Sequence, residues 1–390
     1  MILTVLGGSA HSTPVLVRSL DNGFADESVV VRLVGRDTGR LRAVGRACRL
    51  IADRGHVVVE DYAWPESPEA VRGADAVLVQ IRPGGYEGRA FDETFPLRYG
   101  VPGDEGLGPG GLAAAWRGWP IVRDILGAIR RRNPAATIVL LTSPGSLLVR
   151  LAGAGVIGVC ELPWTTLCAI CGDAERALDA SFEYHGVNHI GWLYNVRVDG
   201  REMPDRSGVA FPSDVVRRFR AWPLKYLRLH YHADDVVAEQ RRAPAARVWQ
   251  LVAIAKRSFD IFACGNRMDI ERALCARRAE WYPDAVVPLL RAIRGRRVAT
   301  PLFLTIAGEG EVQERCYHAA DGRLEVREPS EPPPSEVAET VARFMRYERI
   351  AASAVEQRSL DLAVDALSLH PWIRSRTQAE RLARRVVTQT

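Results

Sequence analysis

Residues 1–20, MILTVLGGSAHSTPVLVRSL, begin with a short apolar run that ends at Gly7-Gly8, and a helix is expected from about Thr13-Pro14 to Leu20. Pro14 suits the first turn of a helix, where its missing N–H group costs nothing. A strand, a glycine turn and a helix in this order predict a nucleotide-binding unit, in which a pyrophosphate meets N–H groups at the helix N-terminus. The usual fingerprint has a third glycine, which Ser9 replaces here.

The following segments continue the alternation of strands and helices. Strands are expected at residues 28–34, 74–81, 136–142 and 155–160, with helices at 37–54 and 119–132. This alternation predicts a parallel sheet with helices on both faces. After about residue 165 the pattern changes to a hairpin with a turn at Asp199-Gly200, followed by helices at 213–220, 226–241, 284–295 and 335–357. We therefore predict an α/β protein with a Rossmann-like domain at residues 1–165 and a mixed α+β domain at residues 166–390.

Composition narrows the function classes. The 390 residues carry a net charge of only +5, and the arginines are scattered without interleaved aromatic residues, which argues against nucleic-acid binding. No run approaches the roughly 20 apolar residues of a membrane helix, and the N-terminal run lacks the basic leader of a signal peptide. The seven cysteines are then expected to be reduced thiols in the cytoplasm. Cys168 and Cys171 have the spacing of a metal or redox pair, but two small residues on a buried helix face are the more economical interpretation.

The acid that grips the ribose of a bound dinucleotide is less clear in this sequence. Asp37 comes two residues late after the second expected strand, and it is equally well placed to cap the next helix. Its neighbour Arg36 is suited either to a 2′-phosphate or to stacking on the adenine.

Residues 80–111, QIRPGGYEGRAFDETFPLRYGVPGDEGLGPGG, show too little periodicity for a helix or a buried strand. We expect an ordered loop here, since long loops in compact domains are usually functional. Its glycines would let the backbone approach a ligand, and Arg82, Arg89 and Arg98 are available to hold an anion. A crossover packed on a neighbouring subunit is the alternative.

Two residues suggest a metal site. Cys160 ends an expected strand in GVCELP, and His189 lies in GVNHIGW. A thiolate and an imidazole suit manganese, iron or zinc, and two protein ligands leave positions open for substrate hydroxyls. Sequence distance alone leaves a buried cysteine and a satisfied histidine as the competing interpretation.

These motifs together resemble glycoside hydrolase family 4, the NAD- and metal-dependent glycosidases that mostly act on 6-phosphoglycosides. The resemblance is collinear over about residues 2–373. It includes the glycine turn with Thr13-Pro14, the string at 80–111, GVCELP, GVNHIGW, PLKYLRLHY at 223–231, RRAEWYPDA at 277–285 and AVDALSLHPWI at 363–373.

The resemblance implies a fold, cofactors and site residues. The C-terminal domain would be of the lactate/malate dehydrogenase type, and the assembly a homodimer or homotetramer. The cofactors would be NAD and a divalent metal, with manganese the first choice, and the partner a small sugar or phosphosugar, with no nucleic acid or membrane. The resemblance implies that Cys160 and His189 bind the metal, that Tyr226 is the base and that Glu161 is the acid for the leaving group. The implied contacts of the cofactor are Gly7, Gly8, Ser9, Ala10, His11, Asp37, Gln80 and Arg82. The implied contacts of the substrate are Arg82, Arg89, Glu105, Ser143, Asn188 and Arg277.

The implied mechanism is a redox elimination with transient oxidation at C3 of the sugar, proton removal at C2 and loss of the aglycone. The chain departs from the family pattern where the sugar would be held: Ser143 replaces an asparagine, and Asp104 and Gly106 replace a glutamine and a threonine. We therefore expect an unusual glycoside substrate. The alternatives are a sugar dehydrogenase or epimerase that keeps only the oxidation step, and a non-catalytic ligand sensor.

Overall fold

The computed structural model describes residues 1–64, 68–202, 213–307, 312–320 and 322–389. Its N-terminal strands form a parallel array in the order β3-β2-β1-β4-β5-β6, which is the strand order of the doubly wound dinucleotide-binding fold. These strands are β1 (Ile2–Leu6), β2 (Val29–Gly35), β3 (Val57–Ala63), β4 (Ala76–Val79), β5 (Thr137–Leu140) and β6 (Val156–Cys160).

Apolar residues cover both faces of this array, because successive side chains of a strand point to opposite sides. On β4, Val77 and Val79 belong to one core cluster, whereas Ala76 and Leu78 belong to a second. The first cluster lies under α4 (Gly108–Arg132), α5 (Gly145–Ala152) and α14 (Ser335–Gln357). The second lies under α1 (Thr13–Gly23), α2 (Thr38–Ile51) and the later helices α11 (Arg247–Cys264), α12 (Arg267–Cys275) and α13 (Val287–Ile293).

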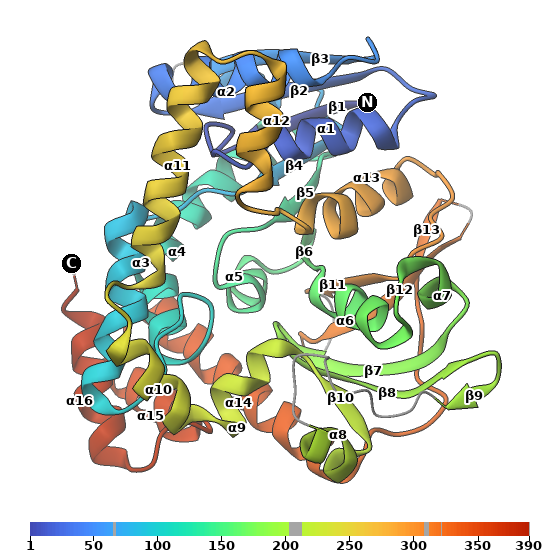
Figure 1. The fold of residues 1–390 in the computed structure, drawn as a ribbon. Helices are drawn as coiled ribbons and strands as arrows, with labels where there is room; N and C mark the ends of the chain where they lie inside the picture. Colours follow the sequence, from blue (N-terminus) through green and yellow to red (C-terminus); the bar gives the residue numbers. More distant parts are fainter. Residues whose placement is uncertain (65–67, 203–212, 308–311, 321, 390) are drawn as a thin grey trace.

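The sheet continues past β6 into an antiparallel half in the order β6-β11-β12-β7-β8-β10. These strands are β7 (Ser181–Val187), β8 (Ile190–Val198), β10 (Ala221–Pro223), β11 (Leu302–Ile306) and β12 (Glu314–Ala320), with β9 (Arg201–Glu202) and β13 (Arg323–Val326) as side strands. Figure 1 shows β11 and β12, late in the sequence, between β6 and β7. The described strands therefore form one continuous sheet across residue 165, and a domain boundary there stays a prediction.

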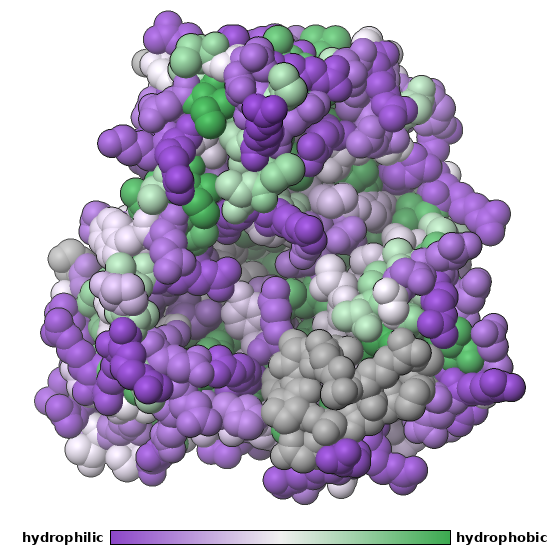
Figure 2. All heavy atoms as spheres, viewed as in Figure 1, coloured by the Kyte–Doolittle hydropathy of each residue, from purple (hydrophilic) through white to green (hydrophobic). Residues whose placement is uncertain are grey.

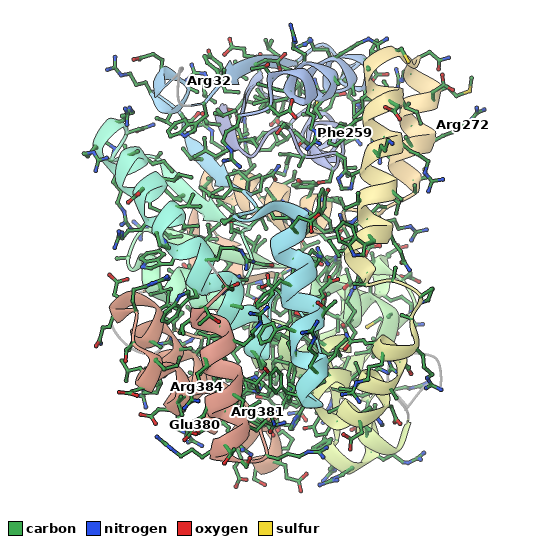
Figure 3. The ribbon with its side chains drawn as sticks, turned by 90° about the vertical axis from the view of Figure 1, so that its left-hand side faces the viewer. Arg32, Phe259, Arg272, Glu380, Arg381 and Arg384 are labelled. Atoms are coloured by element: carbon green, nitrogen blue, oxygen red, sulfur yellow. The ribbon has the colours of Figure 1, made fainter. Side chains whose placement is uncertain are left out.

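The remaining helices enclose the two ends of the molecule. They are α3 (Gly85–Thr94), α6 (Leu162–Cys171), α7 (Ala174–Leu178), α8 (Ser213–Phe219), α9 (Arg228–Tyr231), α10 (Ala233–Arg242), α15 (Leu360–Leu369) and α16 (Arg376–Val387). Figure 3 shows α16 at the lower end, with the charged side chains of Arg381 and Arg384 on its outer surface. In the described part of the chain, no helix has the length and apolar character needed to cross a bilayer.

The prediction of a loop at residues 80–111 was wrong. Most of it is helical: α3 is followed by a short 3₁₀ helix at Phe95–Tyr99, and α4 begins at Gly108, eleven residues before the expected start at Trp119. Two of its glycines serve backbone packing, since a Cβ at Gly103 would lie 1.8 Å from Glu93 O and one at Gly110 would lie 2.1 Å from Asp104 O. The helices α11 and α12 and the strands β3, β11 and β12 were not anticipated.

Candidate active site

A cleft of about 1790 Å³ lies between the N-terminal strands and the later helices. Figure 2 shows the molecule hollowed between its upper and lower parts. The glycine turn, the end of β2, residues 80–106, the end of β6, the β7–β8 turn and parts of α11 all contribute to its wall. The cleft therefore collects nearly every residue that the sequence singled out, from segments far apart in the chain.

Backbone hydrogen bonds hold the glycine turn against the end of β2. The N–H groups of Gly7 and Gly8 both donate to Val34 O, at 3.0 and 2.9 Å. A Cβ at Gly7, whose φ is +92°, would lie 2.7 Å from Gln80 O, and one at Gly8 would lie 2.8 Å from Leu33 Cα. Only glycine fits at either position, and an anion at this turn would meet amides nearer the start of α1.

Gln80 links this turn to the helical segment that begins at Tyr282, 202 residues later in the chain. Its Nε2 donates to Gly7 O at 3.3 Å and to Thr13 Oγ1 at 3.2 Å, while its Oε1 accepts a 2.8 Å hydrogen bond from the Tyr282 hydroxyl. Gln80 lines the cleft, as do Ser9, Ala10 and His11. The predicted cofactor contacts thus surround one end of the cleft, and Gln80 also shapes it.

Asp37 is the N-cap of α2, which was one of the two predicted roles of this residue. Its Oδ1 accepts from the N–H of Arg40 at 3.0 Å, and its Oδ2 pairs with Arg40 Nε at 3.2 Å. Asp37 also lines the cleft, so a ribose contact remains a separate prediction.

Cys160 and His189 converge. Cys160 is the last residue of β6, and His189 occupies the tight turn between β7 and β8 with φ +62°, preceded by Asn188 with φ +21°. Two successive residues with positive φ suit a two-residue hairpin turn, in which asparagine is favoured. The Cys160 Sγ lies 3.4 Å from His189 Nδ1. No group of three or more metal-ligating side chains occurs among the residues that the structure describes, so this pair would leave coordination positions open.

Of the two side chains, only His189 already has the protonation state that a metal ligand needs. Burial lowers the pKa of His189 to about 4, so the imidazole is neutral at pH 7, as a ligand must be. Burial, together with Glu314 and Glu161, raises the pKa of the Cys160 thiol, so the thiolate requires a cation to form.

Tyr226 stacks on the ring of His189, with 4.8 Å between centroids and an interplanar angle of 19°. It lies in a 3₁₀ turn, Lys225–Leu227, directly after β10, and it lines the cleft. Burial raises the pKa of Tyr226, Asp104 raises it further, and Arg247 lowers it. His230 and Tyr231, two other titratable side chains of the same 223–231 motif, are not among the residues that line the described cleft.

Glu161 follows Cys160 and precedes α6. It lines the cleft, and burial raises the pKa of its carboxyl group, against the lowering effect of Lys225. A carboxyl group kept protonated by burial can donate a proton to a leaving group.

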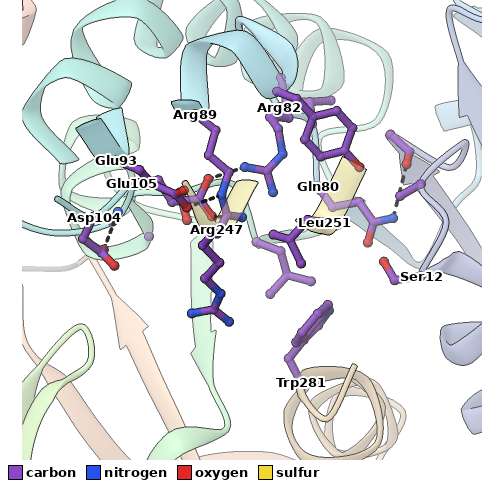
Figure 4. Close-up of a pocket in the computed structure, with 18 of the residues that line it drawn as sticks. Ser12, Gln80, Arg82, Arg89, Glu93, Asp104, Glu105, Arg247, Leu251 and Trp281 are labelled. Atoms are coloured by element: carbon purple, nitrogen blue, oxygen red, sulfur yellow. Dashed lines mark hydrogen bonds and ion pairs between the residues drawn. The ribbon is translucent and has the colours of Figure 1, made fainter. Parts of the chain in front are cut away.

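The anion-binding role predicted for two arginines meets competition inside the protein. Arg82 pairs with Glu105, and Arg89 pairs with Glu105 at 2.5 Å and with Glu93 at 2.7 Å. Figure 4 shows Glu93 and Glu105 meeting the end of Arg89, with Arg82 close by. Glu105 lies at the cleft wall, but its two oxygens are already engaged.

Replacing Arg89 by methionine is expected to destabilise the protein by about 3 kcal/mol or more, because it leaves the buried Glu93 carboxylate without its cation. The Arg89 side chain is 8% exposed, and Glu93 is also held by Val248 N–H at 2.9 Å. Urea unfolding followed by tryptophan fluorescence measures the change. Arg98→Met, at an exposed position of the same segment, is the matched control and should cost far less.

Two other arginines are less neutralised. Arg277 contacts His11 Nε2 at 3.5 Å and lies over the Trp281 ring at 5.4 Å, with no acid paired to it among the described residues. Arg247, at the start of α11, also lacks a described ion pair and lines the cleft near Arg89 (Figure 4). No motif around Arg247 would have singled this residue out from the sequence alone.

Ser143 and Asn188 complete the predicted substrate contacts at the cleft wall. A Cβ at Gly145 would lie 3.3 Å from Asn188 Oδ1, so the loop after β5 and the β7–β8 turn are in direct contact. All residues predicted to act in the site, except Gly8, Arg98 and Cys160, directly line the cleft, and Cys160 lies behind its wall against His189.

Comparison with known proteins agrees with this geometry. The model of the family 4 glycosyl hydrolases matches residues 1–171. A probable 6-phospho-beta-glucosidase of Bacillus subtilis is 24% identical over 98% of this chain and 94% of its own length. The 6-phospho-beta-glucosidase of Thermotoga maritima is 27% identical over 95% of this chain and 94% of its own length.

Solved structures show the same architecture over the whole chain. The Thermotoga maritima 6-phospho-beta-glucosidase with manganese, NAD⁺ and glucose-6-phosphate superimposes with a TM-score of 0.85 at 25% identity, covering 99% of this chain and 97% of that one. A 6-phospho-alpha-glucosidase from gut microorganisms, in complex with NAD and Mn²⁺, gives a TM-score of 0.80 at 18% identity, covering 99% and 97%.

Proposed function

We propose that this chain is a family 4 glycosyl hydrolase, an NAD- and divalent-metal-dependent glycosidase, because the family model matches residues 1–171 and the fold is that of the solved relatives. The family resemblance and the α/β fold expected from the sequence are thereby confirmed. The observation that carries the proposed activity is the approach of the Cys160 sulfur to His189 Nδ1, at 3.4 Å, with Tyr226 stacked on that imidazole.

The residues present fit a metal ion. Cys160 and His189 would hold it, since a thiolate and a neutral imidazole suit manganese, iron or zinc, and manganese is present in the solved relative. The residues also fit a nicotinamide dinucleotide, because the glycine turn at Gly7 and the start of α1 present the backbone to a phosphate group. When bound, the dinucleotide supplies a hydride acceptor and the metal a Lewis acid.

We assign the protein's own part in the reaction to two side chains. Tyr226 removes the proton from C2 of the sugar once C3 has been oxidised to a ketone, because the ketone makes that proton acidic. Glu161, whose pKa is raised by burial, donates a proton to the departing aglycone. Water would add to the elimination product, and a bound dinucleotide would take up and give back the same hydride within one turnover, so no net NADH is expected.

The substrate we propose is a glycoside with an anionic group, such as a phosphosugar. Arg277 and Arg247 are the cations available for that group, because Glu105 already engages Arg82 and Arg89. Ser143 stands where the family pattern has an asparagine, so the side chain offered to the sugar on that side is shorter. Assembly into a homodimer or homotetramer remains a prediction.

The proposal is tested with the full-length protein, NAD⁺, Mn²⁺ and a panel of α- and β-linked glycosides with and without a 6-phosphate. We expect aglycone release without net NADH, and deuterium incorporation at C2 of the product in D₂O. NADH formed in proportion to product would instead identify the dehydrogenase that is the competing hypothesis. Tight cofactor binding with neither release nor exchange across the panel would indicate a ligand sensor.

A further inference from the structure

We propose that the coenzyme site of this chain prefers the 2′-phosphorylated dinucleotide, NADP⁺, to NAD⁺, through the guanidinium group of Arg36. The inference rests on the proposed function, since it assumes that a dinucleotide occupies the cleft beside the glycine turn. In this type of fold the residue at the end of the second strand decides the matter: an acid there binds the ribose 2′-hydroxyl, whereas a nearby arginine accommodates a 2′-phosphate.

The strand-end position carries no acid here, and a side chain would fit there only tightly. Gly35 is the last residue of β2 and lines the cleft. A Cβ at this position would lie 3.1 Å from both Cβ and Oγ of Ser9, and 3.3 Å from a methyl group of Leu41. Any side chain at position 35 would therefore press on the glycine turn itself.

The nearest acid is already used. Asp37 gives one oxygen to the N–H of Arg40 and the other to Arg40 Nε, at 3.0 and 3.2 Å. A ribose hydroxyl at Asp37 would have to share a carboxylate that already caps α2 and pairs with Arg40. The ion pair with Arg40 also offsets the negative charge that would otherwise repel a phosphate close by.

Arg36 is the remaining positively charged residue next to the end of β2. It lies between Gly35 and Asp37, is exposed, lines the cleft and has no hydrogen bond or ion pair with a described residue. Arg40 lines the same part of the cleft, with its guanidinium 5.3 Å from the ring centre of Phe259. Figure 3 shows Phe259 on the side of α11 that faces the N-terminal half. Two guanidinium groups thus border the place where a 2′-phosphate would lie.

The competing role for Arg36 is stacking on the adenine ring. An aromatic residue is already available for that contact, because Trp64 lines the cleft and its N–H donates to Gly35 O at 3.1 Å. Trp64 therefore lies next to the end of β2, on the neighbouring strand connection. With a tryptophan for the base, Arg36 is free for the phosphate.

The test measures affinity rather than turnover. Full-length protein is titrated with NADP⁺ and with NAD⁺ by calorimetry, at low and at high ionic strength. We expect NADP⁺ to bind about tenfold more tightly than NAD⁺, since a charge-assisted contact is worth about that factor. The advantage should shrink at high salt, because Arg36 is exposed.

Arg36→Ala should remove this advantage, lowering NADP⁺ affinity about tenfold while NAD⁺ affinity changes little. Arg36→Lys should keep part of it, because the positive charge remains. Arg42→Ala, an equal change of charge at an exposed site on the adjacent helix α2 outside the cleft wall, should leave both affinities unchanged.

Tighter binding of NAD⁺ than of NADP⁺ by the native protein would overturn the inference and leave the proposed function intact. An equal loss of both affinities in Arg36→Ala would also overturn it, and would assign the side chain to the adenine. Failure of both dinucleotides to bind would contradict the proposed function itself.

Discussion

Replacing Cys160 by serine, or His189 by alanine, is expected to reduce metal-dependent turnover by at least about 100-fold, because even changes behind a metal's ligands cost 10- to 100-fold. A hydroxyl group cannot replace a thiolate toward a cation of intermediate softness. Calorimetric titration with Mn²⁺ in the absence of substrate should show the same loss of affinity, which separates metal binding from catalysis. Excess chelator should reduce the native protein to the level of the variants.

The chain provides a matched control. Phe303 on β11 lies opposite Cys160 on one side and Cys316 on the other, and both cysteines belong to the same buried cluster. Cys316→Ser therefore makes the same chemical change at a similar depth, 5% exposed against 3%, without touching His189. Similar unfolding midpoints for the two serine variants, with activity lost in only one, support the metal site. Full activity of Cys160→Ser in chelator would exclude it.

Replacing Tyr226 by phenylalanine is expected to slow deuterium exchange at C2 by about 100-fold or more, the usual contribution of a positioned general base. The stacking of the ring on His189 does not need the hydroxyl group, so metal affinity should be preserved. Because burial and Asp104 raise the pKa of this phenol above its ordinary value of about 10, its basic form becomes more populated as pH rises. Exchange by the native protein should therefore increase with pH.

Tyr231→Phe is the control for this variant, since Tyr231 packs against Phe219 and Trp192 away from the cleft lining. It should leave exchange intact. Unchanged exchange in Tyr226→Phe would instead direct attention to Asp104. That residue lines the cleft, and burial raises the pKa of its carboxyl group to about 7, within the range of a general base.

The sequence was most informative where local chemistry fixes local shape. The glycine turn, the first two strands and the first two helices, and the Asp199-Gly200 turn were all predicted, and both residues of the Asp199-Gly200 turn have positive φ. The meeting of Cys160 with His189 could be proposed only through the family resemblance, since the two positions are 29 apart in the sequence, with α6, α7 and β7 between them. Their pairing depends on β11 and β12 returning from residues 302–320 to lie beside β6, which no local pattern announces.

The segment at residues 80–111 shows why composition misled us. Its glycines suggested an open loop, yet those at 103 and 110 allow two stretches of backbone to pack almost in contact. Its arginines suggested an anion site, yet Arg89 is held by two glutamates of the same segment. Glycine and arginine content records close packing and internal charge pairing as readily as ligand binding, and only tertiary contacts distinguish them.

The return of β11 to the edge of β6 has a consequence for dissecting the protein. A fragment ending near residue 165 would expose the whole hydrogen-bonding edge of β6. It would also lose α11, α12 and α13, whose apolar residues complete the core behind β1 and β2. Such a truncated polypeptide should self-associate rather than remain a monomer, and cofactor binding would have to be studied in the intact chain.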